Sequence, residues 1–416
     1  MPVTVRSDRE SDVPLPARGR WPGLDVVPRA LVRGLLARLV FRRAVRRLHL
    51  RVLLPNGRVL GSGDAGAPTM RIERSREFFR RVGASGKIGF GEAYMVGAWS
   101  ADDLAGVLTA FASRVTGLVP RPLTWLRRWY DKRHPAEEEN DPTGARENIS
   151  RHYDLSNDLF AQFLDETMTY SSAWFGAGDS LADAQRRKID GILDLAGVGP
   201  GTSTLEIGTG WGSLAIRAAE RGARVTTLTI SAEQQRLATE RIAAAGVCDR
   251  IDVRLHDYRD AEGRYDAVVS VEMIEAVGEL YWPAFFQTID RVLAPAGRAA
   301  LQAITLAHDH MLATRRSYGW LHKYIFPGGL LPSVRAIEET LREHTSLRIV
   351  ARRDLGQHYA QTLRHWRERF LAHWDEVARL GFDGVFHRMW EFYLAYCEAG
   401  FRAGYLGVSQ LALARD

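Results

Sequence analysis

The sequence predicts an α/β fold, a doubly wound sheet of parallel strands, together with a smaller N-terminal α+β domain. A chain of 416 residues is long enough for two domains. Residues 202–305 alternate strand-like apolar runs with amphipathic helix-like runs, the pattern of a parallel sheet with helices on both faces. The first of these strands ends in a glycine-rich turn, residues 208–212 (GTGWG), that leads into a helix.

The domain borders follow from shifts in composition. Residues 1–24 are polar and rich in Pro, Gly and Arg, so we expect a disordered tail. In residues 134–145 two prolines flank four acidic side chains, and we expect a linker there. The N-terminal domain is then predicted over 25–133, as the part in contact with the membrane, the substrate or a second copy. The second domain covers 146–416.

Local patterns predict the elements of the N-terminal domain. Residues 29–54 contain eight arginines and no acid, with apolar side chains at helical spacing for about three turns. Asn56-Gly57 is a strong hairpin-turn signal. Helical patterns resume at residues 75–85 and 100–115.

The second domain is predicted in more detail. The final segment, from His358 onward, is expected to be helical and is unusually aromatic. Ser231 with Gln234 three residues later is a capping-box signature for one of the helices. The expected strands are 202–208, 223–229, 250–257, 265–272 and 298–305, and the expected helices between them are 213–222, 231–246 and 281–297.

Composition limits the kind of protein. Lys plus Arg number 56 and Asp plus Glu 50, so the chain is mildly basic and suits an anionic partner surface. Two cysteines cannot form a disulfide framework, and no His/Cys cluster suggests zinc, so we expect no metal site. No run of ~18 apolar residues predicts a membrane span, and the N-terminus has no apolar signal-peptide core. We therefore expect a cytoplasmic protein.

The glycine turn predicts a nucleotide-bearing cofactor, because glycines let the backbone approach a ligand at a helix N-terminus. A dinucleotide site would have GxGxxG spacing and an acid at the end of the second strand. Here the spacing is GxGxG, and the second strand ends in TTLTIS without an acid. S-adenosylmethionine has no pyrophosphate to hold and needs neither feature, so it is the expected cofactor.

Five segments, in order and spacing, resemble one family. They are HYDLSNDLFAQFLDETMTYSSAWF (152–175), LEIGTGWG (205–212), SVEMIEAVG (270–278), LQAIT (301–305) with KYIFPGGLLPS (323–333), and HYAQTLRHWRERF (358–370). Together they resemble the cyclopropane-fatty-acid synthase family of S-adenosylmethionine-dependent methyltransferases. The likeness is strong over residues 146–416, looser before them, and greatest to an actinobacterial branch making 10-methylene and 10-methyl (tuberculostearic-type) fatty acids.

The resemblance implies a class I methyltransferase-type sheet with a helical lid, and methyl transfer to a cis double bond of a phospholipid acyl chain. An oleoyl-type chain would become a carbocation and then lose a proton. Loss after a hydride shift leaves a 10-methylene branch, which we expect, whereas direct loss closes a cyclopropane, the alternative. The site must hold a charged cofactor beside an apolar chain, exclude water and present a base.

Eight cofactor contacts are implied by the same resemblance. From the residues alone, Thr229 is equally an ordinary strand residue, Gln234 a helix cap and Tyr258 a loop aromatic. The implied contacts are Tyr170 and Ser171 at the methionine end, with Gly208 and Gly210 beneath; Thr229 and Gln234 at the ribose; and Asp257 and Tyr258 at the adenine.

The identity of the base that removes the proton is left open. Many family members bind a bicarbonate ion as base, through a Cys, a Glu, a His, a backbone carbonyl and a Tyr. The matching catalytic positions in this chain are Ser172, Glu275, Gln302, Ile304 and Tyr359. Ser and Gln still donate hydrogen bonds to an anion, but the His that could gain charge is gone. Either bicarbonate persists in a more neutral cage, which we favour, or Glu275 or another group acts directly.

The substrate implies a membrane surface as partner. The Arg-rich segment 29–51 and residues 125–134 (WLRRWYDKRH) could bind anionic headgroups, and a packed helix with a solvated basic face explains the first equally well. We expect no nucleic acid, because no nucleic-acid module accompanies the charge. A flavin- or nicotinamide-dependent reductase is implied if the product is a methylene. A homo-oligomer is also possible.

Two other classes of protein remain open at this point. A nicotinamide-dependent oxidoreductase is opposed by the glycine spacing and the missing acid. A non-catalytic lipid-binding protein is opposed by the intact glycine loop, Glu275 and Tyr359.

Overall fold

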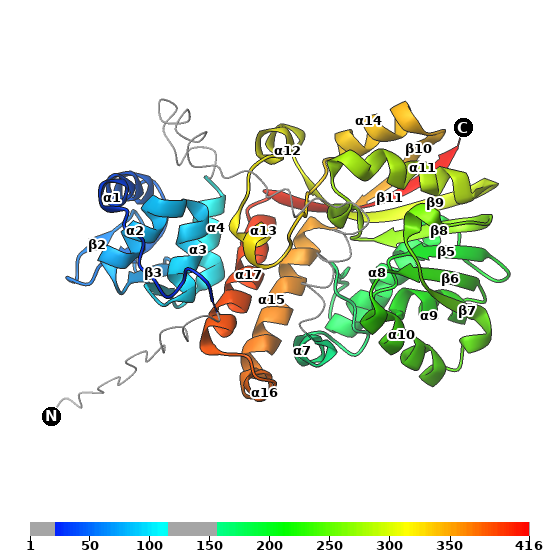
Figure 1. The fold of residues 1–416 in the computed structure, drawn as a ribbon, viewed down its shortest axis with the longest axis horizontal. Helices are drawn as coiled ribbons and strands as arrows, with labels where there is room; N and C mark the ends of the chain where they lie inside the picture. The colour runs from blue at the N-terminus through cyan, green and yellow to red at the C-terminus, as the bar shows by residue number, and fades with distance from the viewer. Residues whose placement is uncertain (1–20, 115–155, 416) are drawn as a thin grey trace. The chain divides into compact units, whose positions relative to one another are not determined.

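A computed structural model describes residues 21–114 and 156–415 of the chain (Figure 1). It divides into two compact units, Met1–Val107 with Gly381–Phe392, and Leu108–Leu380 with Tyr393–Asp416. The predicted linker 134–145, the segment 125–134 and nearly all of the predicted tail lie outside the described residues. The predicted domain borders therefore stay predictions.

The first unit contains a four-stranded sheet in the order β2-β1-β3-β4. The predicted turn at Asn56-Gly57 is confirmed, because β1 and β2 pair antiparallel across it and the Leu54 N–H donates to the Arg58 carbonyl at 2.9 Å. The elements are β1 (Arg51–Leu53), β2 (Val59–Leu60), β3 (Thr69–Ile72), β4 (Trp99–Ala101), α1 (Leu31–Val45), α2 (Ser75–Ser85), α3 (Lys87–Met95) and α4 (Leu104–Ala112).

Helix α1 confirms the helical spacing, but most of its large apolar side chains face outward. Its buried residues are Gly34, Phe41 and Val45. A Cβ at Gly34 would lie 3.2 Å from the Phe79 carbonyl oxygen, and one at Gly83 would lie 2.6 Å from backbone of α1. The helices α1 and α2 thus meet through glycines, which leaves an exposed apolar row of Leu31, Val32, Leu35, Leu36 and Leu39.

The second unit is built on a seven-stranded sheet in the order β10-β11-β9-β8-β5-β6-β7. The five strands expected from the sequence, β5 to β9, are all present and pair in parallel. Their bounds are β5 (Ser203–Ile207), β6 (Arg224–Thr229), β7 (Ile251–Leu255), β8 (Tyr265–Val271) and β9 (Leu293–Leu306).

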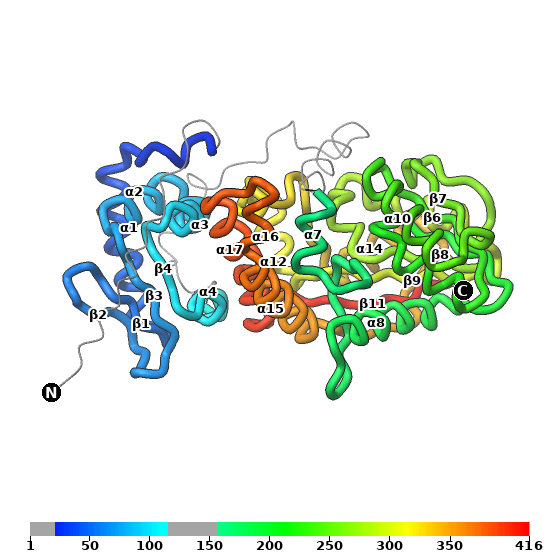
Figure 2. Tube along the Cα trace, turned by 90° about the horizontal axis from the view of Figure 1, so that it is seen from below, coloured from blue at the N-terminus to red at the C-terminus, as the bar shows by residue number. Residues whose placement is uncertain are grey.

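Helices cover both faces of this sheet. Successive side chains of β8 point to opposite faces and pack against different helices. Val268 packs in one core with Phe285 of α11, whereas Ala267 and Val269 pack in another with Ile192 of α8. Figures 1 and 2 show α8 beside the sheet near β11. The helices are α7 (Asn157–Phe163), α8 (Leu181–Ala196), α9 (Ser213–Glu220), α10 (Ala232–Ala244), α11 (Trp282–Val292), α12 (His308–Thr314), α13 (Trp320–Tyr324), α14 (Val334–His344), α15 (Gly356–Ala372), α16 (Trp374–Arg379) and α17 (Gly384–Arg402), the last shared with the first unit.

The chain's last elements correct one expectation. Helices α15 to α17 are helical as predicted, but residues 406–415 form a strand, β11 (Leu406–Arg415). It pairs antiparallel with β9 on one side and with β10 (Leu347–Asp354) on the other. A strand buried on both faces shows no polar alternation, so its sequence does not distinguish it from a buried helix.

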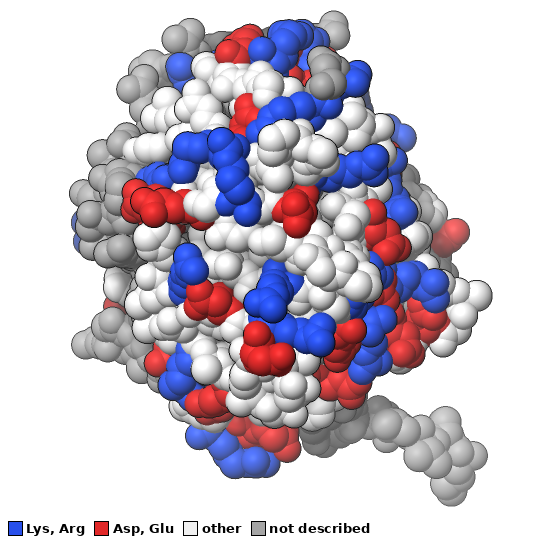
Figure 3. Space-filling view, turned by 90° about the vertical axis from the view of Figure 1, so that its right-hand side faces the viewer, with Lys and Arg blue, Asp and Glu red and all other residues white. Residues whose placement is uncertain are grey.

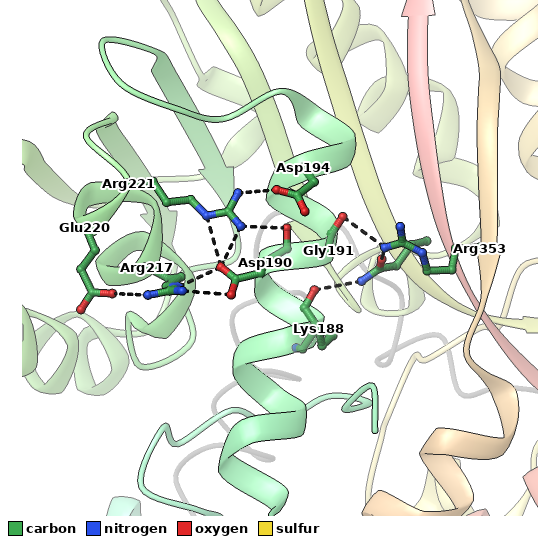
Figure 4. A network of polar contacts seen from close by, with 9 residues as sticks. Lys188, Asp190, Gly191, Asp194, Arg217, Glu220, Arg221 and Arg353 are labelled. Atoms are coloured by element: carbon green, nitrogen blue, oxygen red, sulfur yellow. Dashed lines mark hydrogen bonds and ion pairs between the residues drawn. The ribbon is translucent and has the colours of Figure 1, made fainter. Parts of the chain in front are cut away.

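Helix α8 is fixed at both sides by polar contacts (Figure 4). Asp190 receives two hydrogen bonds from Arg217, at 2.8 and 3.0 Å, and others from Arg221. On the opposite side, Arg353 donates to the Gly191 carbonyl at 3.3 Å. The helix is therefore held against α9 and against β10, which positions Lys188 at its centre.

Candidate functional site

A cavity lies at the carboxyl ends of β5, β6, β7 and β8, the edge where an open α/β sheet binds its ligand. It brings together side chains from segments far apart in the chain. All eight predicted cofactor residues line it: Tyr170, Ser171, Gly208, Gly210, Thr229, Gln234, Asp257 and Tyr258.

The glycine turn has the backbone that only glycine adopts readily. The φ angles of Gly208, Gly210 and Gly212 are +99°, +52° and +87°. Gly212 is the N-cap of α9, so the turn leads into a helix N-terminus at the cavity. The predicted strand, glycine turn and helix are therefore present, and cofactor binding by the turn stays a prediction.

The predicted ribose pair is already in contact. The Thr229 hydroxyl donates to the Gln234 Oε1 at 2.9 Å, and both side chains are buried. Ser231 caps α10, accepting from the Gln234 N–H at 3.2 Å. The Gln234 side chain turns to Thr229, and the Ser231 N–H donates to the Thr229 hydroxyl at 3.1 Å, so the predicted capping box is only half formed. The ribose contact of Gln234 stays a prediction.

At the far end of the cavity, Asp257 accepts from Arg259 with both oxygens, at 2.9 and 2.8 Å. Tyr258 packs edge-on against Phe285, with ring centroids 5.4 Å apart. Burial raises the pKa of Tyr258 to about 12. This phenol is therefore neutral at physiological pH.

Two buried ionisable residues in the cavity wall were not predicted to have a role. Lys188 of α8 donates to the Ser171 hydroxyl at 2.6 Å, and burial lowers its pKa to about 8. Glu206 of β5 accepts from Thr227 at 2.6 Å, and burial raises its pKa to about 8. Glu206 is part of the glycine-loop motif in the sequence. Lys188 carries no sequence signal, because only the folded structure brings it into contact with Ser171.

The predicted catalytic residues lie elsewhere: none of them lines the cavity. Three of them instead donate to one carboxylate that the sequence prediction did not name, that of Glu272. Its Oε1 accepts from the Ser172 N–H at 2.9 Å and from the Gln302 amide at 2.8 Å. Its Oε2 accepts from the Tyr359 hydroxyl at 2.8 Å.

Glu272 links the cofactor cavity to the predicted catalytic residues. It follows directly on β8, and it lines the cavity as a half-buried residue. Burial raises the pKa of Glu272, an effect opposed by the Ser172 N–H, the Lys188 charge, Gln302 and Tyr359. Its backbone φ of +50° is one of three positive values at non-glycine residues in the described part of the chain.

Glu275 lies one turn later, in a short 3₁₀ turn over Ile274–Ala276. The Glu275 Oε1 accepts a hydrogen bond from the Ile304 N–H. The resemblance instead implied that the Ile304 carbonyl contacts a bicarbonate ion. The Glu275 Oε2 is buried and has no hydrogen-bond partner. Burial and then the Glu272 charge raise the pKa of Glu275 to about 8, so it is mainly protonated at pH 7.

A further glutamine, also unpredicted, fixes this assembly. The Gln410 amide of β11 donates to the Gln302 Oε1 at 3.0 Å and to the Lys188 carbonyl at 3.1 Å. Gln302 therefore presents its NH₂ to Glu272. Arg353 in turn donates to the Gln410 Oε1 at 3.1 Å, which links the assembly to the network around α8.

Aromatic rings surround Tyr170 and Tyr359. The Tyr170 and Tyr393 hydroxyls are 2.6 Å apart. The Tyr170 ring lies 5.1 Å from Trp366, and the Tyr359 ring 4.6 Å from Phe401. Such rings present electron-rich faces that attract a cation.

Two further observations bear on the kind of site. Within the part of the chain that the structure describes, no group of three or more His, Cys, Asp or Glu side chains could hold a metal ion. Across residues 21–114 and 156–415, no helix is long and apolar enough to cross a membrane.

Comparison with known proteins agrees with this geometry. The family model for mycolic acid cyclopropane synthetase matches residues 140–411. The chain is 53% identical to tuberculostearic acid methyltransferase UfaA1 of Mycobacterium tuberculosis (strain ATCC 25618 / H37Rv), over 95% of this chain and 96% of the relative. It is 35% identical to the cyclopropane-fatty-acyl-phospholipid synthase of Escherichia coli (strain K12), over 85% of this chain and 89% of the relative.

Solved structures show the same likeness over the second unit's fold. The cyclopropane synthase MmaA2 from Mycobacterium tuberculosis matches with a TM-score of 0.60 and 32% identity, covering 65% of this chain and 98% of its own. The mycolic acid cyclopropane synthase CmaA1, complexed with SAH and CTAB, matches with a TM-score of 0.60 and 30% identity, covering 64% and 97%.

Proposed function

Because the chain belongs to the mycolic acid cyclopropane synthetase family and is an S-adenosylmethionine-dependent methyltransferase, we propose that it methylates the cis double bond of an oleoyl-type phospholipid acyl chain. The proposed product is a 10-methylene-branched chain. The relative named for tuberculostearic acid, with 53% identity over nearly the whole chain, supports this product over a cyclopropane.

The cavity suits this cofactor. A sulfonium and an ammonium both carry positive charge, and the buried Glu206 carboxylate in the cavity wall gains from a cation beside it. Gly208 and Gly210 leave the backbone open, and Thr229, Gln234 and Asp257 offer polar groups for hydroxyls and ring nitrogens. Bound there, S-adenosylmethionine supplies an electrophilic methyl group on its sulfonium sulfur.

The chain's own residues then have three tasks. The cavity holds the reactants together, which reduces the entropic part of the barrier. The rings of Tyr170 and Tyr359, with their aromatic neighbours, stabilise positive charge on the acyl chain by roughly 0.5–2 kcal/mol per ring face. A base beside the cavity removes the proton, and the family pattern would assign this to bicarbonate held by the predicted catalytic residues.

The observation that carries the proposal is the convergence of eight predicted cofactor residues on one cavity. The test is to express the chain in a host rich in oleoyl phospholipid and to analyse its lipids by mass spectrometry and NMR. We expect a gain of one carbon and vinylidene protons. A cyclopropane signal would replace the proposed product by the alternative, and unchanged lipids would contradict the function.

We also propose that the exposed face of α1 binds a phospholipid membrane, making the protein a peripheral one at the inner face of the membrane. Leu35, Leu39, Arg42 and Arg46 follow one another at intervals of three or four, so they share one face. Leu35 and Leu39 are 62% and 64% exposed. An apolar row beside arginines suits acyl chains below anionic headgroups.

The charge of α1 supports an anionic partner. The pKa of Arg42 is lowered by partial loss of water and then by the positive charges of Arg38, Arg58 and Arg46. A negative headgroup would relieve this repulsion. By contrast, basic and acidic side chains are intermixed on the face drawn in Figure 3.

Vesicle sedimentation tests this surface, with phosphatidylcholine vesicles that do or do not contain phosphatidylglycerol. The double variant Leu35→Gln/Leu39→Gln should bind at least ~10-fold more weakly, since each exposed leucine contributes ~1.5–3 kcal/mol when buried. Leu280→Gln, which changes an 80% exposed leucine of the second unit, should bind normally. Equal sedimentation of the double variant and the wild type would contradict the α1 surface.

A 10-methylene product would need a separate reductase, flavin- or nicotinamide-dependent, to give the methyl branch. We propose such a partner on chemical grounds, because the described cavity has one nucleotide-type loop and the reaction supplies no hydride donor. A homo-oligomer stays a prediction. Incubating the lipid product with a cell extract and NADPH, and following loss of the vinylidene signal, tests the reductase.

A further inference from the structure

We propose that the Glu272 carboxylate is the general base of this reaction and takes the place that a bound bicarbonate ion has in the family pattern. The inference rests on the proposed function and names the group that removes the proton. It assigns Ser172, Gln302 and Tyr359 the role of holding a side-chain carboxylate, whereas the sequence prediction had them hold a free ion.

The first argument is that the hydrogen-bond donors expected to bind bicarbonate already bind Glu272. The Ser172 N–H, the Gln302 amide and the Tyr359 hydroxyl all donate to Glu272, at 2.8–2.9 Å. A carboxylate and a bicarbonate ion present the same kind of paired oxygens to such donors. Since Gln410 fixes the direction of the Gln302 amide, the donors are set for the Glu272 oxygens.

The second argument is access. Glu272 lines the cofactor cavity, whereas none of the five predicted catalytic residues, Glu275 among them, does so. A general base must reach the proton it removes. Glu275 has its free oxygen buried, so it does not meet this condition.

The third argument is the backbone. A φ of +50° places Glu272 in the left-handed region, which costs a non-glycine residue roughly 1–2 kcal/mol. Glycine would adopt this conformation without that cost. A glutamate kept in a strained position that faces a cavity points to a role for its side chain.

The surroundings of the two carboxylates also differ. Burial raises the pKa of both, but at Glu272 three hydrogen-bond donors and the Lys188 charge oppose this rise. Glu275 has one hydrogen bond and the repulsion of Glu272, which favour its protonated form. A neighbouring pair whose environments separate their protonation is the arrangement that assigns acid and base.

The step is balanced. After methyl transfer the carbocation lies on the carbon next to the new methyl-bearing carbon, and the hydride shift moves it onto the methyl-bearing carbon itself. A C–H bond of the new methyl group then breaks, and its electron pair forms the C=CH₂ double bond of the methylene branch. The proton goes to a Glu272 oxygen, and the neutral acid later returns it to water.

The test combines substitution with removal of bicarbonate. In buffer freed of carbon dioxide, the wild type should keep its full turnover. Glu272→Gln should lose at least ~100-fold in turnover, in the range of general-base loss, and should keep its affinity for S-adenosylmethionine by calorimetry. Glu262→Gln, the same change at an exposed loop residue, is the matched control.

A second variant gives a readout apart from turnover. Glu272→Gly relieves the backbone strain and leaves the three donors free, so millimolar bicarbonate should raise its melting temperature and restore part of its turnover. Bicarbonate should do neither for the wild type. If the wild type needs bicarbonate, if Glu272→Gln stays active, or if Glu272→Gly ignores bicarbonate, the base assignment is overturned. A wild type that methylates no lipid would overturn the proposed function itself.

Discussion

The two halves of the site are built by different means. In the cofactor half, Gly208, Thr229 and Asp257 each lie at a strand end or within two residues of one, so the sheet alone brings them together. In the reactive half, Glu272 meets partners that are 30, 87 and 100 residues away in the chain. The first half depends on backbone shape and the second on a network of side chains, and the two should respond differently to substitution.

The largest effect should come from the backbone of the cofactor half. Gly208→Val places a β-branched residue at a φ of +99° beside the cavity, so affinity for S-adenosylmethionine should fall at least ~100-fold by calorimetry. Gly201→Val, at the other end of β5 with a φ of +81° and open space around its Cβ, is the control. It should lose comparable stability and keep the affinity. Normal binding of S-adenosylmethionine by Gly208→Val would show that the cofactor half does not depend on the backbone shape of its glycine turn.

A smaller effect should come from one donor of the reactive half. Tyr359→Phe removes the hydrogen bond to Glu272 Oε2, and kcat should fall roughly 10- to 30-fold. The dissociation constant of the cofactor should not change, because Tyr359 does not line its cavity. Tyr265→Phe, at the opposite end of β8, should leave kcat unchanged. A change in cofactor affinity in place of kcat would show that the halves are not separate.

The smallest effect should appear in stability. Because the pKa of Glu275 is raised to about 8 in the fold and is 4.5 in the reference state, unfolding lets it ionise between these values. The contribution of Glu275 to wild-type stability should therefore be fully present below pH 4.5 and be lost as pH rises to 8. Relative to Glu275→Gln, the loss should be on the order of 2 kcal/mol between pH 5 and pH 6.5, measured by urea unfolding at these two pH values. Parallel pH profiles would contradict a protonated Glu275.

The features that the sequence could predict also differ between the cofactor half and the reactive half. Strands β5 to β9 and the glycine turn were predictable, since apolar periodicity and glycine spacing are local signals. Strand β11 was missed, and residues 406–415 were wrongly expected to be helical, because burial on both faces removes the alternation. Strand β10 was also missed: it is an edge strand in which only Leu347 is buried, so it has no alternation of buried and exposed residues either.

The reactive half was predicted in part. Ser172, Gln302 and Tyr359 do gather, as the family resemblance implied, but around Glu272. No local signal marks Glu272, because its role comes from a left-handed backbone and from distant donors. Lys188 and Gln410 were missed for the same reason: a buried polar residue is recognised only once its partners are known.

The position of β11 has a consequence for synthesis on the ribosome. This strand, at residues 406–415, lies between β9 and β10, and within the sheet β10 has no other neighbour. Until those residues leave the exit tunnel, β10 has no partner and Gln410 cannot orient Gln302. A nascent chain thus forms its cofactor loop before its proton-accepting assembly, so we expect no complete turnover until residues 406–415 have left the ribosome.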